Sequence, residues 1–211
     1  MELESGKCIK AFDGNSSSAT CIKNVLDDKL ISADDQGSIK IFKIKTGVCL
    51  KTINAHASAI YKILLISNDR FSTCSSDKMI KLFDLNTFEC IRKFIGHEDV
   101  VWCIERLSND KIISCSRDFT IRIWDLDSGR CLKILKEHGK SVTSMIVSDD
   151  KIISGSDGEI KVWNFGSGDC LQTLNVGHNN YIRSIVKISN EKVASGDQDG
   201  ILIIWNSGEI K

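Results

Sequence analysis

Short runs of apolar residues alternate with short polar segments along the whole chain. In residues 100–125 the runs VVWCIERL, KIISCS and TIRIWD are separated only by SND and RDF. Within such runs apolar and polar side chains alternate, and β-branched and aromatic residues are frequent, as expected for strands with one buried face. No segment keeps the period of an amphipathic helix over a useful length. The pattern therefore predicts short antiparallel strands joined by tight turns.

One short segment recurs along the chain, as ESGKCIKAF (4–12), TGVCLKTI (46–53), TFECIRKF (87–94), SGRCLKIL (128–135) and SGDCLQTL (167–174). Its cysteines lie 41, 41, 41 and 39 residues apart, at Cys8, Cys49, Cys90, Cys131 and Cys170. A fixed period of this size indicates stacked supersecondary units. The sequence therefore predicts an all-β domain over residues 1–211, with about twenty strands in antiparallel meanders. The repeat units are residues 5–45, 46–86, 87–127, 128–166 and 167–207.

Composition narrows the functional classes. Lys and Arg total 28, and Asp and Glu also total 28, a balance that argues against a general binder of nucleic acids or membrane surfaces. The start, MELESGKCIK, is charged where a secretion signal needs an apolar core. Nine cysteines without an export signal indicate reduced thiols in the cytoplasm, with the nucleus as the alternative. No cysteine pair has the C-x-x-C spacing of a zinc site, so neither a metal nor a cofactor is expected.

Two recurring motifs carry a family resemblance. GH at residues 96–97 and SCSRDFTIRIWD at residues 114–125 recur in register, and together they resemble the WD-repeat (tryptophan–aspartate repeat) family of β-propellers. The resemblance extends over residues 5–207. It implies a ring of four-stranded antiparallel blades around a central channel. It also implies a protein that performs no catalysis and serves as a platform for assembling other proteins.

The resemblance further implies a buried hydrogen-bond chain in each blade, from Asp to His, from His to Ser or Thr, and from that hydroxyl to a Trp ring N–H. Phe83 has no ring N–H, so the second chain should be shorter, and the fourth unit is two residues short between its His and Asp157. The first unit has Asn15, Gln36 and Phe42 at the His, Asp and Trp positions, and we expect it to be the least stable. Because all four histidines belong to this set, none is left for acid–base catalysis. The set comprises His56, Thr73, Asp77, His97, Ser114, Asp118, Trp124, His138, Ser154, Asp157, Trp163, His178, Ser195, Asp199 and Trp205.

Ring closure is predicted from the two ends of the chain. In the resembling fold the outer strand of the last blade comes from the N-terminus. Here the first outer-strand copy (residues 4–12) has no strands before it, and the last three strands are followed only by SGEIK. We therefore expect residues 4–12 to complete a fifth blade beside ILIIWN (201–206). The alternative is a piece of a longer, seven-bladed propeller, since the family usually has about seven blades. A closed ring predicts a monomer, and an open one predicts a larger assembly.

In the resembling fold, three positions of each repeat face the usual binding side. They are the third and fifth positions after the His and the position before the Asp. Both tyrosines of the chain and the one Trp outside the repeat position fall in this set, beside two arginines. Trp, Tyr and Arg are the side chains that dominate interface hot spots. The alternative is that Tyr61 and Trp102 only pack between neighbouring strands. With Lys140 near them, the expected partner-binding residues are Tyr61, Val100, Trp102, Arg117, Lys140, Tyr181, Arg183 and Gln198.

The predicted function is that of a non-catalytic scaffold or adaptor, which binds a peptide or loop of another protein on this face. One alternative is the substrate-recognition module of a ubiquitin ligase, in which Arg117 and Arg183 bind a phosphorylated or acidic motif. Another is a repeat array without a dedicated ligand. An enzyme is not expected, because a propeller glycosidase needs paired carboxylates and the inner strands carry only Glu105. HGKS (138–141) is not a phosphate loop, since Ile134 stands where that motif needs its first Gly.

Overall fold

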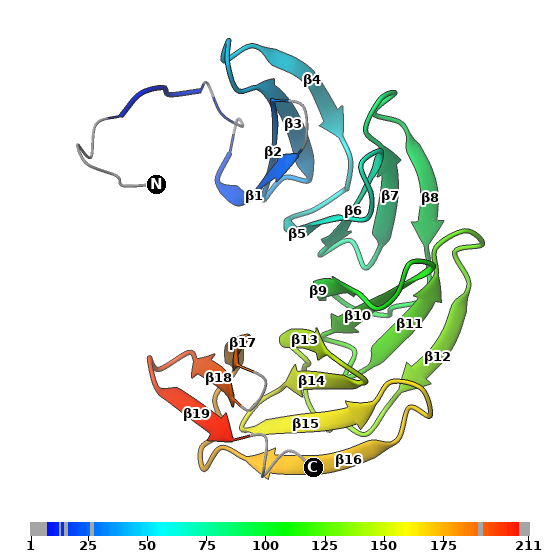
Figure 1. The fold of residues 1–211 in the computed structure, drawn as a ribbon, viewed down its shortest axis with the longest axis vertical. Helices are drawn as coiled ribbons and strands as arrows, with labels where there is room; N and C mark the ends of the chain where they lie inside the picture. Colours follow the sequence, from blue (N-terminus) through cyan, green and yellow to red (C-terminus); the bar gives the residue numbers. More distant parts are fainter. Residues whose placement is uncertain (1–7, 13, 15–16, 26–27, 190–191, 207–211) are drawn as a thin grey trace.

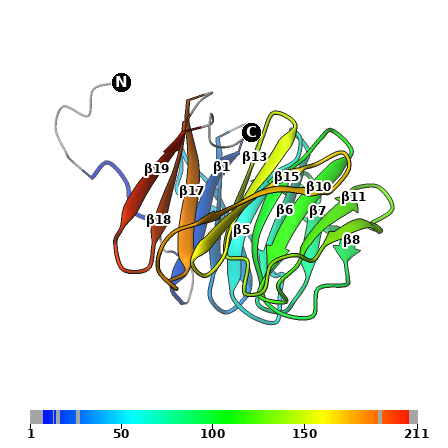
Figure 2. The same cartoon turned by 90° about the horizontal axis from the view of Figure 1, so that it is seen from below.

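The computed structural model describes residues 8–12, 14, 17–25, 28–189 and 192–206. These residues form nineteen strands and no helix, in five antiparallel sheets. The sheets stand side by side in an open arc around a central hollow (Figure 1). Seen from the side, the strands run across the thickness of the arc (Figure 2). The predicted all-β fold of repeated antiparallel units is thus confirmed.

Each sheet is a meander of consecutive strands, here numbered blade one to blade five in chain order. The first strand of each blade lines the hollow, and the last lies on the outside (Figure 1). Blade one contains β1 (Ala19–Val25), β2 (Lys29–Asp34), β3 (Ser38–Lys43) and β4 (Cys49–Asn54). Blade two contains β5 (Ile60–Leu65), β6 (Arg70–Ser75), β7 (Ile80–Asp84) and β8 (Cys90–Phe94). Blade three contains β9 (Val101–Arg106), β10 (Lys111–Ser116), β11 (Ile121–Asp125) and β12 (Cys131–Leu135). Blade four contains β13 (Ser144–Ser148), β14 (Lys151–Gly155), β15 (Glu159–Asn164) and β16 (Cys170–Asn175). Blade five contains β17 (Ile182–Ser189), β18 (Lys192–Asp197) and β19 (Leu202–Asn206).

The apolar core lies between the blades, because each of the three middle sheets presents one face to the blade before it and the other to the blade after it. Ile121 and Ile123 of β11, for example, are 0% and 4% exposed and pack in one cluster with Met145 and Trp163 of blade four. Burying one such side chain contributes about 1.5–3 kcal/mol. Three further clusters of the same kind join the other neighbouring blades. The period-two alternation in the sequence therefore positions the blades against one another.

The recurring cysteine lies at a β-bulge. In blade three the register between β11 and β12 shifts at this point, so that Cys131 faces Trp124. The Cys131 thiol donates to the carbonyl oxygen of Lys133, with an Sγ–O distance of 3.4 Å. The same register shift and thiol contact recur in blades one, two and four. The repeated cysteine is therefore a residue of the bulge, and all nine cysteines are free thiols.

The predicted ring closure is not seen in the described residues. Blade five has three strands, and residues 8–12, the described part of the predicted closing strand, belong to no sheet. They lie instead against blade one, where Lys10 donates to the carbonyl oxygens of Ile44 and Lys45. The Phe12 ring meets the Phe42 ring edge-on, with 5.4 Å between centroids. This contact covers an aromatic side chain that has no preceding blade to cover it, and closure stays a prediction.

The last blade leaves apolar side chains uncovered as a result. Leu202 and Ile204 on β19 are 80% and 64% exposed. They occupy the positions of Ile121 and Ile123, which the next blade covers.

Within the described residues no three His, Cys, Asp or Glu side chains are arranged to hold a metal ion. The same residues contain no helix long and apolar enough to cross a membrane.

Candidate functional site

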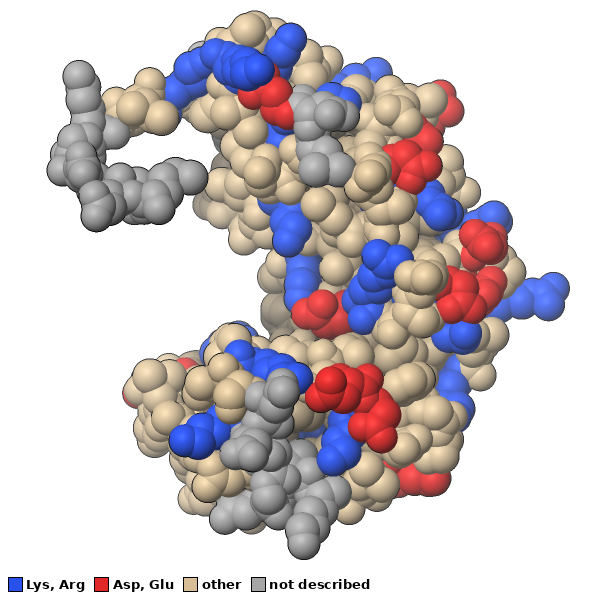
Figure 3. Space-filling view, in the orientation of Figure 1, with Lys and Arg blue, Asp and Glu red and all other residues tan. Residues whose placement is uncertain are grey.

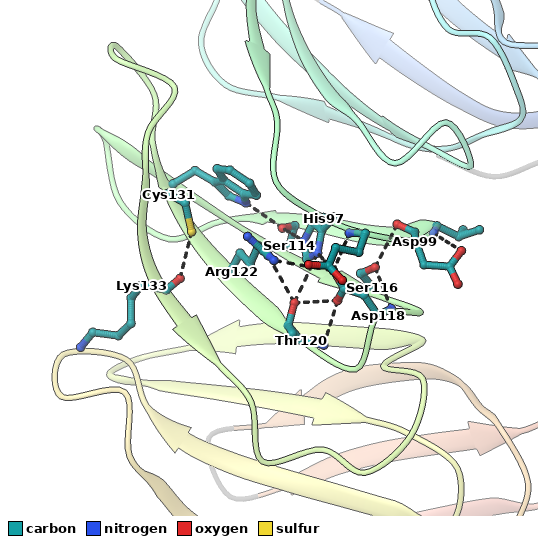
Figure 4. A network of polar contacts seen from close by, with 12 residues as sticks. His97, Asp99, Ser114, Ser116, Asp118, Thr120, Arg122, Cys131 and Lys133 are labelled. Atoms are coloured by element: carbon teal, nitrogen blue, oxygen red, sulfur yellow. Dashed lines mark hydrogen bonds and ion pairs between the residues drawn. The ribbon is translucent and has the colours of Figure 1, made fainter.

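The predicted polar chain is complete in blade three (Figure 4). His97 Nδ1 lies 2.7 Å from Asp118 Oδ2, and its Nε2 lies 2.7 Å from Ser114 Oγ. The Trp124 ring N–H donates to the same hydroxyl oxygen at 2.7 Å. His97, Ser114 and Trp124 are buried, so each needs these partners to offset the loss of water. The chain ties the loop before β9 to β10 and β11.

Blade two carries the shortened chain expected from its sequence. His56 bonds Asp77 and Thr73, each at 2.8 Å, and the chain stops there. Phe83 instead stacks on Phe71, with 5.1 Å between ring centroids. An apolar ring contact therefore takes the place of the missing N–H.

The electrostatics of these chains are those of a structural network. Burial lowers the pKa of His56 and His97, and it lowers the pKa of His138 to about 4, against the opposing effect of their carboxylate partners. Burial acts to raise the pKa of Asp77, yet its contacts with His56 and with the backbone N–H groups of Ala57 and Met79 together lower that pKa to about 2. The rings of His56, His97 and His138 are thus neutral at pH 7, and both nitrogens of each ring have a partner.

In blade four the structure corrects one predicted partner. His138 Nδ1 contacts Glu159 Oε1 at 2.8 Å, and Asp157 takes no part in the chain. Compared with blade three, blade four has one residue fewer between His138 and Ser154 and one fewer between Ser154 and Trp163, so residue 21 after the His is Glu159. Ser154 completes the chain, with His138 Nε2 at 2.7 Å and the Trp163 N–H at 2.8 Å. Counting from the His instead of aligning on Asp would have identified Glu159.

Blade five departs from the prediction as well. His178 Nε2 lies 2.9 Å from Asp197 Oδ2, at ion-pair distance but without hydrogen-bond geometry. Asp199 instead accepts from the side-chain amide of Asn180 at 2.5 Å. Ser195 still accepts from the Trp205 ring N–H at 2.8 Å. At the open end of the arc the members of the predicted chain are therefore divided among three separate contacts.

Blade one shares the acidic residue that alters blade five. Asp34 precedes Gln36 as Asp197 precedes Asp199, and its Oδ1 accepts the backbone N–H groups of Gln36 and Ser38. The predicted Asn15 lies outside the described residues. Phe42 is buried and, like Phe83, offers no ring N–H. The two end blades thus use an Asp-centred turn where the middle blades use the His chain.

The predicted partner-binding residues gather on one edge of the arc, here called the turn face. It consists of the starts of the inner strands and the turns between the second and third strands of each blade. Backbone hydrogen bonds join these two parts in blades three and five, from Arg117 to Val100 at 2.9 Å and from Gln198 to Tyr181 at 3.0 Å. In Figure 3, basic and acidic side chains lie in small groups of both signs along the visible side of the arc.

One half of the turn face is an aromatic pair across blades two and three. The rings of Tyr61 and Trp102 lie 4.6 Å apart between centroids, and Ser76 donates to the Tyr61 hydroxyl at 2.9 Å. Both rings are half-buried against the apolar clusters between the blades, so packing explains part of their position. Beside them the Arg117 side chain is 62% exposed, with its Nε 3.7 Å from Asp99 Oδ2.

The other half is a cationic group on blades four and five. The Arg183 guanidinium lies over the Tyr181 ring, 5.3 Å from its centroid, and donates to the Gln198 side-chain carbonyl at 2.9 Å. Lys140 reaches the side-chain oxygen of Asn179 at 3.4 Å. Asp157 is close enough to feel both cations, yet burial outweighs them and raises its pKa. The structure thus brings the predicted residues into two groups, and sequence reasoning missed Asp99 and Asn179, which no repeat mark distinguishes.

The chain was compared with known proteins. The sequence model described as WD domain, G-beta repeat matches residues 6–43, 47–84, 88–125, 129–164 and 168–206. The chain has no significant match among curated proteins. Among solved structures it is similar to the computationally designed Ika8 protein, at 28% identity and a TM-score of 0.81, over 92% of this chain and 60% of that one.

Two further solved structures are similar. The WD40 beta propeller domain of Doa1 shares 27% identity at a TM-score of 0.74, over 84% of this chain and 60% of that one. U3-55K shares 22% identity at a TM-score of 0.81, over 96% of this chain and 64% of that one. The chain therefore spans 60% to 64% of the length of these three structures.

Proposed function

The chain belongs to the WD domain, G-beta repeat family, and from this premise we propose that it is a non-catalytic scaffold that binds a peptide or loop of another protein on its turn face. Propellers of this family generally bind other proteins and generally do not catalyse reactions. The proposed site comprises both halves of the turn face. We expect the protein to act in the cytoplasm, as its reduced cysteines suggest.

The observation that carries this proposal is the partnering of Arg183. Its guanidinium is held by a neutral amide and an aromatic ring, so its position is fixed while its charge is not neutralised by a salt bridge with either of them. Lys140 likewise has an amide oxygen as its partner. Asp157 lies near both cations, but its buried Oδ1 accepts no hydrogen bond. Cations that are hydrogen-bonded to neutral groups favour a ligand that brings negative charge, because a charge-assisted hydrogen bond is stronger than a neutral one.

The aromatic pair, in the other half of the turn face, supports the same function. Tyr61 and Trp102 offer a half-buried ring surface whose conformation is already fixed by their contact and by Ser76. Ordered aromatic side chains bind with little loss of conformational entropy. A segment that crosses the hollow would place an apolar side chain on this pair and an acidic one at Arg183.

The test is binding by variants of matched charge. Arg117→Glu with Arg183→Glu reverses two cations of the turn face. Arg92→Glu with Arg130→Glu makes the same change in net charge at exposed positions on the outer strands and the opposite turns. Partners captured by the unaltered protein and by the control, but lost at least about tenfold in the turn-face variant, support the proposal. If the turn-face variant keeps every partner, the proposal is wrong.

A phosphorylated motif, as in substrate recognition by a ubiquitin ligase, is the second candidate. The same exposed arginines support it, since guanidinium groups bind phosphate and carboxylate in the same way. Synthetic peptides matched in sequence separate the two, one with Ser, one with phosphoserine and one with Glu. Binding of the phosphorylated peptide alone selects the second candidate, and equal binding of the last two selects a general acidic motif.

A further inference from the structure

A pair of thiols on the inner wall of the arc lies apart from the turn face. Cys103, on β9, stands directly opposite Cys115, on β10, in the antiparallel register. Opposite residues project from the same face of a sheet, with Cβ atoms about 4.5–5.5 Å apart. Both side chains belong to the apolar cluster between blades three and four. The backbone therefore holds two free thiols as neighbours.

A lysine from the adjacent blade points at this pair. Lys62 Nζ lies 3.4 Å from Cys103 Sγ and 2.5 Å from Glu105 Oε1. The other blades have Cys or Ser at the repeat position of Lys62, so the ammonium is a departure from the repeat. Glu105, the one inner-strand carboxylate noted in the sequence, thus orients Lys62 beside the sulfur.

The two thiols differ in acidity. The hydrogen bond from Cys115 is the largest cause that lowers the pKa of Cys103, and the Lys62 charge adds to it, against burial and the Glu105 charge. Burial raises the pKa of Cys115 well above its usual value. Only the thiolate is a nucleophile. One sulfur of the pair is thus suited to attack, and the other stays protonated beside it.

We propose that Cys103 is a peroxide-reactive thiol and that Cys115 converts its oxidised form into a disulfide. The Cys103 thiolate attacks one oxygen of hydrogen peroxide, the O–O bond breaks, and hydroxide leaves. The hydroxide takes the proton of Cys115, and the resulting Cys115 thiolate attacks the sulfur of the sulfenic acid. The S–S bond forms, the S–O bond breaks, and hydroxide leaves. Two electrons pass from the two thiols to one peroxide molecule.

The position of Cys103 beside the hollow determines both how peroxide reaches the thiol and what its oxidation changes. Cys103 is 8% exposed, while the side chains of Lys62 and Glu105 are 34% and 26% exposed where β5 and β9 line the hollow. A molecule as small as hydrogen peroxide needs only such an opening. Disulfide formation removes the thiolate and leaves Glu105 as the one anion bonded to Lys62. Oxidation therefore makes this part of the wall more positive.

The test compares the rate of oxidation of the buried Cys103 with the rates of exposed cysteines. The folded protein receives limiting hydrogen peroxide and is quenched in denaturant with dimedone, so that only peroxide must reach the folded site. Peptide mass spectrometry then measures oxidation at each cysteine. Cys49 and Cys90 are the controls, because both are exposed and contact backbone carbonyls. We expect a Cys103–Cys115 disulfide to form at least about tenfold faster than either control is oxidised.

Variants separate the two roles. Cys115→Ser keeps a hydroxyl donor and should accumulate sulfenic acid at Cys103. Lys62→Met should slow Cys103 to the rate of the controls, and Lys62→Arg should restore the fast rate, with urea midpoints checking the fold. If oxidation follows exposure, or if Lys62→Met leaves the Cys103 rate unchanged, the reactive thiol is refuted. If sulfenic acid forms at Cys103 in the unaltered protein without the disulfide, the role of Cys115 is refuted.

Discussion

Blade four offers the sharpest test of the structural reasoning, because two acidic residues compete for one histidine. The sequence motif selects Asp157, and the structure selects Glu159. The perturbation is therefore a pair of variants, Glu159→Ala and Asp157→Ala, each of which removes one carboxylate from the same turn region. Their effects on the free energy of unfolding should differ strongly.

The magnitude follows from what each carboxylate contacts. The His138 side chain is 0% exposed, and without Glu159 its Nδ1–H loses an acceptor 2.8 Å away. Leaving a buried donor unpaired costs about 1–3 kcal/mol. Lys161, whose side chain is 9% exposed, also loses a carboxylate 3.6 Å from its Nζ, although it keeps the Thr173 hydroxyl. We expect a total loss of about 2–3 kcal/mol for Glu159→Ala.

Removing Asp157 should cost almost nothing. Its Oδ1 is buried without a hydrogen-bond partner, and burial raises the pKa of the carboxyl group. Replacing an unsatisfied buried acceptor by a methyl group removes a penalty rather than a bond. Asp157→Ala should therefore stay within about 0.5 kcal/mol of the unaltered protein or stabilise it slightly.

The assay is urea unfolding at pH 7, followed by tryptophan fluorescence, since Trp163 lies in the same chain of hydrogen bonds. Glu159→Gln keeps a side-chain oxygen acceptor and should recover part of the loss, which separates a hydrogen-bond effect from a packing effect. A loss in Asp157→Ala equal to or larger than that in Glu159→Ala would refute the assignment of Glu159.

Three further predictions follow from the same contacts. First, burial lowers the pKa of His56, His97 and His138 below the ordinary value of 6.5. As the pH falls below 6.5, only the unfolded state takes up protons at these residues, so urea midpoints should be highest above pH 6.5 and decline toward pH 4. His138 alone should contribute about 3 kcal/mol to this loss of stability. Second, Trp124→Phe removes the N–H that donates to Ser114 and should cost about 1–2 kcal/mol by urea unfolding, which makes blade three resemble blade two. Third, Leu202→Lys with Ile204→Lys should change stability by less than about 0.5 kcal/mol, because both side chains are already exposed, and should reduce self-association in light scattering; Ile121→Lys, at the equivalent covered position, should unfold the protein.

The sequence predicts the blades well because each one is a local structure. Strand, turn and strand follow within a few residues, and alternation fixes which side chains face the neighbouring blades, as Ile121 and Ile123 show. The polar chain of blade three was also predictable, since His97, Ser114 and Asp118 keep their spacing. In these features the fold agrees with the local sequence pattern.

The failures arise where geometry overrides the pattern. Asp157 fits the motif, but blade four has one residue fewer on each side of Ser154, and Glu159, with its longer side chain, makes the contact with His138 instead. In blade five Asp197 introduces a second carboxylate, so His178 approaches it rather than Asp199. Whether the ends meet depends on the angle between successive blades, summed over the arc, and no single motif encodes that angle.

The departures from the repeat are therefore more informative about function than the repeat itself. A residue at a shared packing position must satisfy the same neighbours in every blade, which keeps such positions alike. Lys62 and Trp102 occur in one blade each, and both lie where an inner strand faces the hollow or the turn face. Packing alone requires neither side chain, because the other blades form the same sheet without them. Side chains of this kind, found once and fixed by a neighbouring blade, are those whose replacement should change binding or reactivity while the fold persists.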